Sequence, residues 1–283
     1  MKSLFINPVL NKEIKLRFRS FKGFLGLFFY LVALGIIGMG FIIVNTVVSS
    51  SSVFSPEQSR MMFMVLSFVQ LALILFMTPG LTAGVISGER ERQTLNILLT
   101  TPQSSTSIIL SKLLSSISYL LLMMLSSMPI YSIVFLFGGV SPSLLVSTFS
   151  LYFLTMFTIG SLGVLFSTLI RKTIISSIVT YGLTLFLTAG TAFLIIIVGD
   201  LFFYQNSSSV FPYILAMVNP FIILMSTYEP YMIDEIQRTS GIDFSLVASF
   251  VITYFVISAL ALWVSIIKLR PRMKAKKGTV SNE

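Results

Sequence analysis

Four consecutive charged residues, Glu89 to Arg92, stand in a chain that is otherwise largely apolar. The chain has no cysteine and no histidine, which excludes thiol nucleophiles, zinc clusters and histidine acid–base chemistry. It also lacks the phosphate-binding pattern G-x-x-x-x-G-K-[ST], the zinc pattern H-E-x-x-H and the nucleophile pattern G-x-S-x-G. The chemistry open to this charged run is therefore ion pairing and hydrogen bonding, either with another protein or with water in a solvated loop.

The residues around the charged run have the spacing of a short amphipathic helix over 88–99. Polar side chains recur at i, i+3, i+4 and i+7, at Glu89, Arg92, Gln93 and Asn96. An apolar stripe lies beside them, at Leu95, Leu98 and Leu99. Pro102 ends the segment, because proline cannot continue a helix. Such a helix is suited to docking in a groove of another protein, although the same pattern also fits a solvated loop.

The composition places the whole chain in a membrane. Of its 283 residues, 55% are hydrophobic and only 10% are charged, whereas soluble domains carry about 25% charged residues. The net charge of +9 is typical of cytosolic loops in a membrane protein and does not indicate nucleic-acid binding. The first apolar run is too long for the core of a cleavable signal peptide, so we expect none.

Six apolar stretches reach the roughly 20 residues that a membrane-spanning helix needs. They are residues 24–48, 61–86, 108–137, 143–170, 173–198 and 244–267. We therefore predict an all-α polytopic membrane protein that forms a single transmembrane domain over 1–283. Hydroxyl residues within the spans, such as Ser116, Ser161 and Ser167, are expected to bond across helices, or alternatively to line a mildly polar path.

A basic segment precedes the first span. Over residues 7–22, Leu10, Ile14 and Phe18 share one helical face, and lysine and arginine residues occupy the opposite face. This pattern predicts an amphipathic helix that lies in the membrane interface. The alternative is a positive flank that only sets the topology.

The positive charges also predict the orientation of the spans. All but Arg60 and Arg238 of the 19 Lys and Arg residues fall on one side of a six-span arrangement. By the positive-inside rule, both termini and the loop with the charged run are cytosolic, and residues 199–243 are external.

The external loop contains two short apolar segments, 210–218 and 221–226, separated by Asn219 and Pro220. Each segment is too short to span a bilayer. We predict a helical hairpin over 210–226 that dips into the outer leaflet, with a folded external cap as the alternative.

The spans themselves carry almost no ionisable chemistry. Acidic and basic residues lie outside the predicted spans or at their edges, whereas transporters driven by ion gradients usually keep such groups near the bilayer midplane. If the protein does work, a partner must therefore supply the energy. Pro79, Gly80 and Pro129 are expected to kink their helices, either as part of a gate or as tolerated bends.

The segment Ile86-Ser87-Gly88-Glu89-Arg90-Glu91-Arg92-Gln93-Thr94-Leu95, followed by Leu98-Leu99-Thr100-Thr101-Pro102, resembles the signature of permeases of ATP-binding-cassette (ABC) transporters of the type-two exporter family. The resemblance implies that 88–99 is a coupling helix that docks on a separate ATPase subunit. It implies that the coupling residues are Glu89, Arg90, Glu91, Arg92, Thr94, Leu95, Leu98 and Leu99. Gln93 stands where glycine is common, a departure that is not expected to matter.

The resemblance has further implications for partners. ATP and magnesium would bind to the partner ATPase, and this chain would hold no catalytic, metal or cofactor-binding residue. A second permease subunit, identical or a sister, and membrane lipids would complete the assembly, with residues 7–22 as a connecting helix. The expected function is that of a permease subunit of an ATP-driven exporter in a bacterial cell membrane. The alternative is a non-transporting scaffold or sensor that regulates an ATPase-containing complex through the same helix.

Overall fold

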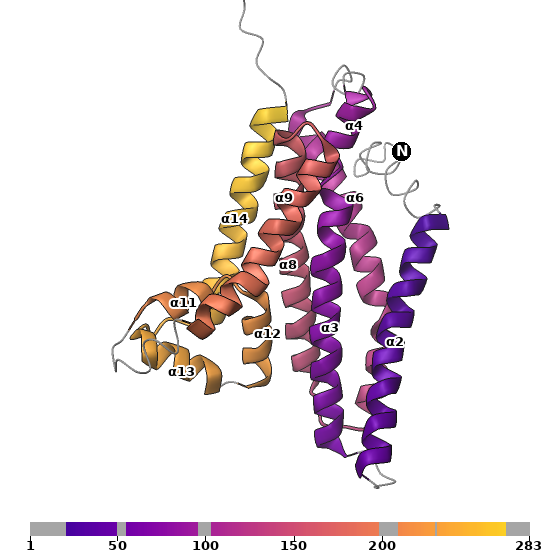
Figure 1. Cartoon of the computed structure of the whole chain (residues 1–283), viewed down its shortest axis with the longest axis vertical. Coiled ribbons are helices and arrows are strands. Elements are labelled where there is room, and N and C mark those ends of the chain that lie inside the picture. The colour runs from indigo at the N-terminus through magenta and orange to yellow at the C-terminus, as the bar shows by residue number, and fades with distance from the viewer. Residues whose placement is uncertain (1–20, 50–54, 96–102, 198–208, 230, 270–283) are drawn as a thin grey trace, which may run out of the picture.

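In the computed structural model the chain is built from helices (Figure 1). The structure describes residues 21–49, 55–95, 103–197, 209–229 and 231–269, and these ranges contain no strand. The predicted all-α class is therefore confirmed. The interfacial helix predicted over 7–22 lies almost wholly outside the described residues.

The number of membrane spans agrees with the sequence. The described residues contain six helical stretches that are long and apolar enough to cross a membrane, at Gly23–Val47, Pro56–Glu91, Ser105–Leu136, Pro142–Leu169, Thr173–Ile197 and Leu246–Leu269. The prediction of six spans is confirmed. The second stretch has 36 residues, which corresponds to roughly 50 Å of helix. A hydrocarbon core is about 30 Å thick, so the charged end of this stretch extends beyond it.

The long helices are α2 (Phe21–Ser49), α3 (Pro56–Thr82), α6 (Ser105–Ser126), α8 (Pro142–Leu169), α9 (Thr173–Leu185) and α14 (Leu246–Leu269). The short elements are α4 (Ser87–Glu91), α7 (Met128–Leu136), the π-helix η1 (Phe186–Gly190), α11 (Phe211–Ala216), α12 (Pro220–Tyr228) and α13 (Tyr231–Ser240).

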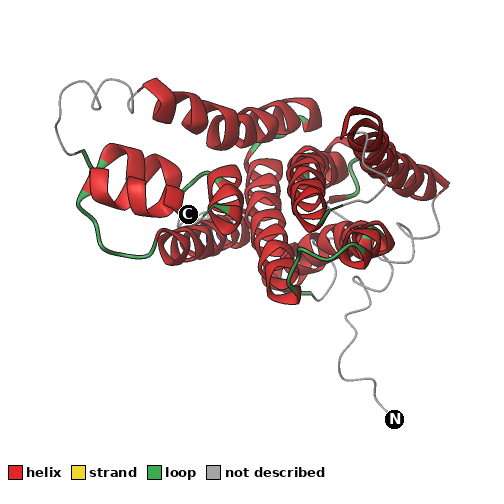
Figure 2. Ribbon diagram, turned by 90° about the horizontal axis from the view of Figure 1, so that it is seen from below, coloured by secondary structure: helices red, strands yellow, loops and turns green. Residues whose placement is uncertain are grey.

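Helix α8 is the centre of the bundle. It packs against α14, α3, α9 and α6, and the helices viewed from below form an elongated cross-section rather than a ring (Figure 2). The peripheral helices α2, α9 and α14, with η1 and the residues after it, leave large apolar side chains exposed, including Phe28, Ile36, Ile178, Phe193, Phe255 and Trp263. Because the chain spans a membrane, these faces are suited to lipid or to another membrane-embedded chain.

Small side chains allow α8 and α3 to approach closely. A Cβ atom on Gly163 of α8 would overlap the Thr82 hydroxyl oxygen and would lie 3.3 Å from the Ala83 backbone nitrogen. Elsewhere in the same interface, the Tyr152 hydroxyl donates a hydrogen bond of 2.8 Å to the Ser67 carbonyl. In a bilayer, close backbone approach and buried hydrogen bonds hold helices together, because lipid supplies little hydrophobic driving force.

Two spans are interrupted along their length. The third span breaks at Ser127, between α6 and α7, and Pro129 lies at the start of α7. The Ser127 hydroxyl lies 3.0 Å from Gln70 Oε1 on α3, which holds the break against a neighbouring helix. The fifth span changes from α-helix to π-helix at η1, a change that no residue pattern predicted.

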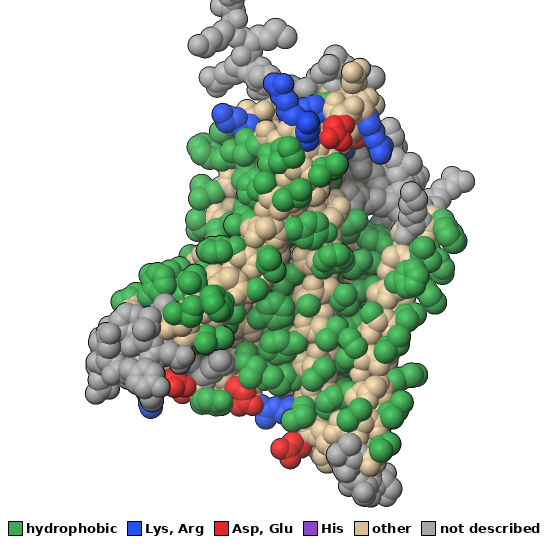
Figure 3. Space-filling view, in the orientation of Figure 1, with side chains coloured by type: hydrophobic (Ala, Val, Ile, Leu, Met, Phe, Trp, Pro, Cys, Tyr) green, Lys and Arg blue, Asp and Glu red, His purple; other side chains and the backbone are tan. Residues whose placement is uncertain are grey.

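Charges divide between the two ends of the bundle (Figure 3). The α4 end is where α2 begins, α9 begins and α14 ends (Figure 1). Its basic residues include Arg90, Arg92, Lys112, Arg171, Lys172 and Lys268. The described charges of the opposite end are Glu57, Arg60, Glu229, Asp234, Glu235, Arg238 and Asp243. The described residues thus keep the charge asymmetry on which the predicted orientation rests.

The segment after the fifth span contains three short helices. Helix α11 lies within the segment 210–226 for which a hairpin was predicted. Helix α12 begins in that segment and continues to Tyr228. Helix α13 was not predicted, because its exposed Asp234, Glu235 and Arg238 remove the apolar signal that identifies the other helices. Its apolar residues Ile233 and Ile236 pack against the core.

The close contact between α8 and α3 predicts a specific sensitivity. We expect Gly163→Ala to destabilise the protein by about 1–3 kcal/mol, because the added methyl group overlaps Thr82. The matched control is Gly182→Ala on α9, where an added Cβ would meet no atom within 4 Å and where alanine favours the helix by about 1 kcal/mol. The measurement is the melting temperature of each purified variant. Equal melting temperatures for the two variants would contradict this account of the interface.

Candidate functional site

Helix α4 carries most of the charged run and lies at the end of α3, beside the turn between α8 and α9 (Figure 1). The first backbone N–H groups of a helix have no partner within the helix. Here a side chain of α8 supplies one: the Ser167 hydroxyl oxygen accepts hydrogen bonds from the N–H groups of Ile86, at 2.8 Å, and Ser87, at 2.9 Å. All three residues are buried. Helix α4 is therefore capped by another span and fixed in orientation relative to α8.

Glu89 points back into the subunit. Its Oε1 lies 3.0 Å from Nζ of Lys112 on α6, with the Lys112 side chain 5% and the Glu89 side chain 31% exposed. The Thr94 hydroxyl donates to the other carboxylate oxygen. Burial acts to raise the pKa of the Glu89 carboxyl, but the Thr94 hydroxyl and the Lys112 ammonium outweigh it and hold that pKa below its usual range. Glu89 is therefore charged and links α4 to α6.

Glu91 links α4 to the beginning of α9. Its two carboxylate oxygens accept hydrogen bonds of 2.8 Å from the backbone N–H and the hydroxyl of Thr173. The residue that precedes α9, Lys172, makes no side-chain cap of its own. Glu91 thus places a negative charge at a helix N-terminus, where the helix dipole favours it. The Thr173 N–H and hydroxyl lower the pKa of the Glu91 carboxyl.

Arg90 reaches α8 at its C-terminal end. Its guanidinium donates a hydrogen bond of 3.2 Å to the carbonyl of Thr168, in the last turn of α8. A cation is favoured at a helix C-terminus, because unpaired carbonyl groups point toward it. Three consecutive charged residues of the run therefore bond to other helices of the same subunit, namely α6, α8 and α9.

The prediction of one continuous helix over 88–99 is wrong at its middle. Helix α4 ends at Glu91, and Gln93 adopts a φ of 58°. The N–H groups of Thr94 and Gln93 then bond to the carbonyls of Glu89, at 2.9 Å, and Arg90, at 3.1 Å. This pair of bonds around a left-handed residue is the Schellman motif that ends helices. Glycine adopts such a conformation without a steric cost, so a glutamine at 93 is less favourable for the backbone than a glycine would be.

The remaining predicted coupling residues have different environments. Arg92 is exposed. Leu95 is only 7% exposed and belongs to the core of the subunit, so little of its side chain is open to a partner in this arrangement. Leu98 and Leu99 lie outside the described residues.

A comparison with protein families decides the class of protein. The model of a family described as ABC-2 family transporter protein matches residues 8–266. The chain belongs to the ABC-2 transporter family. It is thus a permease component of an ABC transporter. No curated protein was found to match it.

The kink residues predicted in the ABC-2 permease occupy two different settings. Pro79 lies inside α3, which continues to Thr82. A Cβ on Gly80 would lie 2.8 Å from the Tyr181 hydroxyl of α9, so Gly80 leaves room for the end of that side chain against α3. Pro129 starts α7 after the break at Ser127. A role of these residues in a gate stays a prediction.

Asn219 of the permease connects the α11–α12 pair to the π-helix. Its side-chain nitrogen donates to the Thr188 carbonyl at 2.7 Å and to the Thr191 hydroxyl at 2.8 Å. Its side-chain oxygen accepts the N–H groups of Phe221 and Ile222 and so caps α12. A π-helix widens the backbone and is often found at functional sites. Sequence reasoning identified Asn219 as a breaker between apolar segments and missed this contact.

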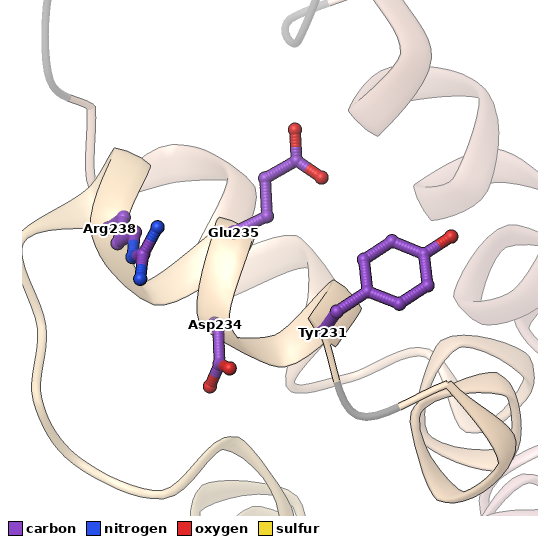
Figure 4. Close-up of a pocket in the computed structure, with 4 residues that line it drawn as sticks. All are labelled: Tyr231, Asp234, Glu235 and Arg238. Atoms are coloured by element: carbon purple, nitrogen blue, oxygen red, sulfur yellow. The ribbon is translucent and has the colours of Figure 1, made fainter.

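A hollow of about 420 Å³ lies beside α13 of the permease, lined by Tyr231, Asp234, Glu235 and Arg238. All four residues belong to one helix, and their side chains point in different directions (Figure 4). The described residues hold no group of three or more His, Cys, Asp or Glu residues placed to bind a metal. This surface therefore has less organised chemistry than α4, which we take as the candidate functional site.

The left-handed conformation at position 93 predicts an asymmetric response to substitution. We expect Gln93→Val to destabilise the permease by about 1–2 kcal/mol, since a left-handed conformation is least favourable for a β-branched residue. Gln93→Gly should be neutral or slightly stabilising, because glycine adopts this conformation without a steric cost. The two variants are compared by melting temperature. The assignment of the helix end would be wrong if the valine variant melted at or above the temperature of the glycine variant.

Proposed function

We propose that this chain is the permease subunit of an ATP-driven exporter and that α4 and the residues after it contact a separate ATPase subunit. The chain has no phosphate-binding loop of its own, so hydrolysis requires a partner. Family membership supports such a partner, and the charged α4 end offers a surface for it.

One observation carries the proposal more than any other: α4 is bonded to three spans at once. Glu89 contacts α6, Arg90 and Ser167 join α4 to α8, and Glu91 contacts α9. A displacement of α4 by a partner would therefore act on three membrane helices together. Exposed Arg92 is the charge that this arrangement leaves for a partner, and Leu98 and Leu99 remain the proposed apolar contacts.

The proposed cycle follows from these bonds. The ATPase binds ATP with magnesium and closes, α4 moves with it, and the attached spans change between an inward-open and an outward-open arrangement. A second permease subunit, identical or a sister, and lipid would cover the exposed apolar faces of α2, α9 and α14. By the positive-inside rule, the α4 end and both termini are cytosolic, and α13 is external.

The ATPase contact can be tested by copurification. We expect Arg92→Glu and Leu98→Asp to reduce the ATPase activity that copurifies with the tagged permease by roughly tenfold, equivalent to about 1.4 kcal/mol of binding energy. The matched control is Arg238→Glu, the same charge reversal on α13 at the opposite end. Permease in the membrane is quantified for each variant.

Two outcomes would contradict parts of this function. Wild-type copurification of ATPase activity by both Arg92→Glu and Leu98→Asp would exclude the proposed docking site. Normal copurification without substrate-stimulated hydrolysis or substrate movement in vesicles, for the unsubstituted complex, would instead favour a scaffold or sensor over an exporter.

The orientation can be tested with cysteine labelling, since the chain has no cysteine. We expect an impermeant thiol reagent to label Asp234→Cys in intact cells and to label Lys172→Cys only after the membrane is opened. Both positions are exposed in the structure and lie at opposite ends of the bundle. Labelling of Lys172→Cys in intact cells, with Asp234→Cys protected, would reverse the proposed topology.

A further inference from the structure

The two ends of the fifth span are each bonded to a different part of the molecule. At the α4 end, both oxygens of Glu91 bind Thr173, the first residue of α9. Near the other end, Asn219 binds the Thr188 carbonyl within η1 and the Thr191 hydroxyl just after it. Along a helix, the separation between Thr173 and Thr188 corresponds to about 22 Å. The span therefore connects α4 with the α11–α12 pair, across most of a bilayer.

The buried face of this span is made of small hydroxyl residues. They recur about every four positions, at Ser176, Thr180, Thr184, Thr188 and Thr191. The threonine hydroxyls donate to carbonyls of the span itself, as in the bonds from Thr180 to Ser176, at 2.7 Å, and from Thr184 to Thr180, at 2.8 Å. These bonds stay within the span, so that short side chains make part of its packing against α3 and α8, beside the Tyr181 ring that lies against Phe76 of α3.

Such a face has a mechanical consequence. Large interdigitating side chains resist sliding, whereas short side chains with their hydrogen bonds satisfied internally allow small shear movements between packed helices. Of the large side chains of this span, Ile178, Phe186 and Phe193 are exposed on its outer face. Leu183, Leu187 and Ile195 pack against the core, so the hydroxyl face is only part of the contact. A shift of the span as a unit would therefore keep the hydrogen bonds that its threonines donate within the span. The bonds at its two ends would move α4 and the α11–α12 pair together with it.

We propose that α9 and η1 couple the position of α4 to that of the α11–α12 pair, with Glu91 and Asn219 as the positioning residues at the two ends. This inference rests on the proposed function in one respect: the ATPase is the partner that would move α4. The coupling itself is a property of the permease alone, so it can be tested without the ATPase.

The test uses two cysteine reporters in the full-length permease in nanodiscs, where both faces of the bilayer meet solvent. The Arg171→Cys reporter lies in the turn before α9, and the Glu229→Cys reporter lies at the end of α12. Each is combined with a variant at the far end of the span. The measurement is the rate of reaction with a soluble maleimide, after circular dichroism has confirmed helix content.

The variants separate the linkage from simple loss of a cap. Glu91→Ala removes the bonds to Thr173, whereas Glu91→Gln keeps a side chain of the same size that can still accept the Thr173 N–H. Asn219→Asp keeps the oxygen that caps α12 and loses the nitrogen that binds Thr188 and Thr191. Glu57→Ala is the control, an exposed carboxylate at the first turn of α3. If Glu91→Ala fails to fold, Thr173→Ala is used in its place. That variant removes the bond from the Thr173 hydroxyl and keeps the bond from the backbone N–H.

We expect Glu91→Ala to change the reaction rate of the Glu229→Cys reporter, and Asn219→Asp that of the Arg171→Cys reporter, each by about fivefold or more relative to Glu57→Ala. Glu91→Gln should largely restore the rate of the Glu229→Cys reporter.

Since coupling between two sites is reciprocal, a change at only one reporter would overturn the proposal, as would no change at either. Reciprocal changes together with wild-type ATPase copurification by Arg92→Glu and Leu98→Asp would support the linkage and refute only the proposed docking site.

Discussion

A buried backbone N–H group must find an acceptor, and the turn between α3 and α4 meets this requirement with a side chain from elsewhere. The Ser167 hydroxyl accepts the N–H groups of Ile86 and Ser87. Near a bilayer, where water is scarce, an unpaired backbone group is costly, so this contact determines where α4 can lie. With α4 in this place, Glu89, Arg90 and Glu91 contact α6, α8 and α9.

The side chains of the charged run therefore fall into two groups that its sequence does not separate. Three of its side chains hold the membrane helices together at the α4 end, and Arg92 remains exposed. The short length of α4 has a local cause. The Schellman motif at Gln93 turns the chain after Arg92, so that Leu95 enters the core of the subunit instead of extending an exposed apolar stripe. A partner that binds this end meets an element that is already part of the membrane domain.

The spans could be predicted from the sequence because hydropathy is a local property, and all six stretches are found near the expected boundaries. Local patterns could not predict the contacts of the site. Ser167 is 80 residues from Ser87, and Thr173 is 82 residues from Glu91. Helix α13 has too little apolar surface to be recognised, and η1 has no sequence signal that we can identify. Position 93 is different: the resemblance placed this glutamine where glycine is expected, and glycine is the residue that a left-handed conformation favours.

The cap that Glu91 provides has a consequence for biosynthesis. Chains are made from the N-terminus, so α3, α4 and the carboxylate of Glu91 leave the ribosome long before Thr173. Helix α9 has no side-chain cap from the residue before it, and its exposed Ile174, Ile175 and Ile178 are apolar. The carboxylate that caps the fifth span is therefore made before the span itself, but α4 is placed only when Ser167 is present, six residues before Thr173. The last turn of α8 and the first turn of α9 thus meet α4 almost together.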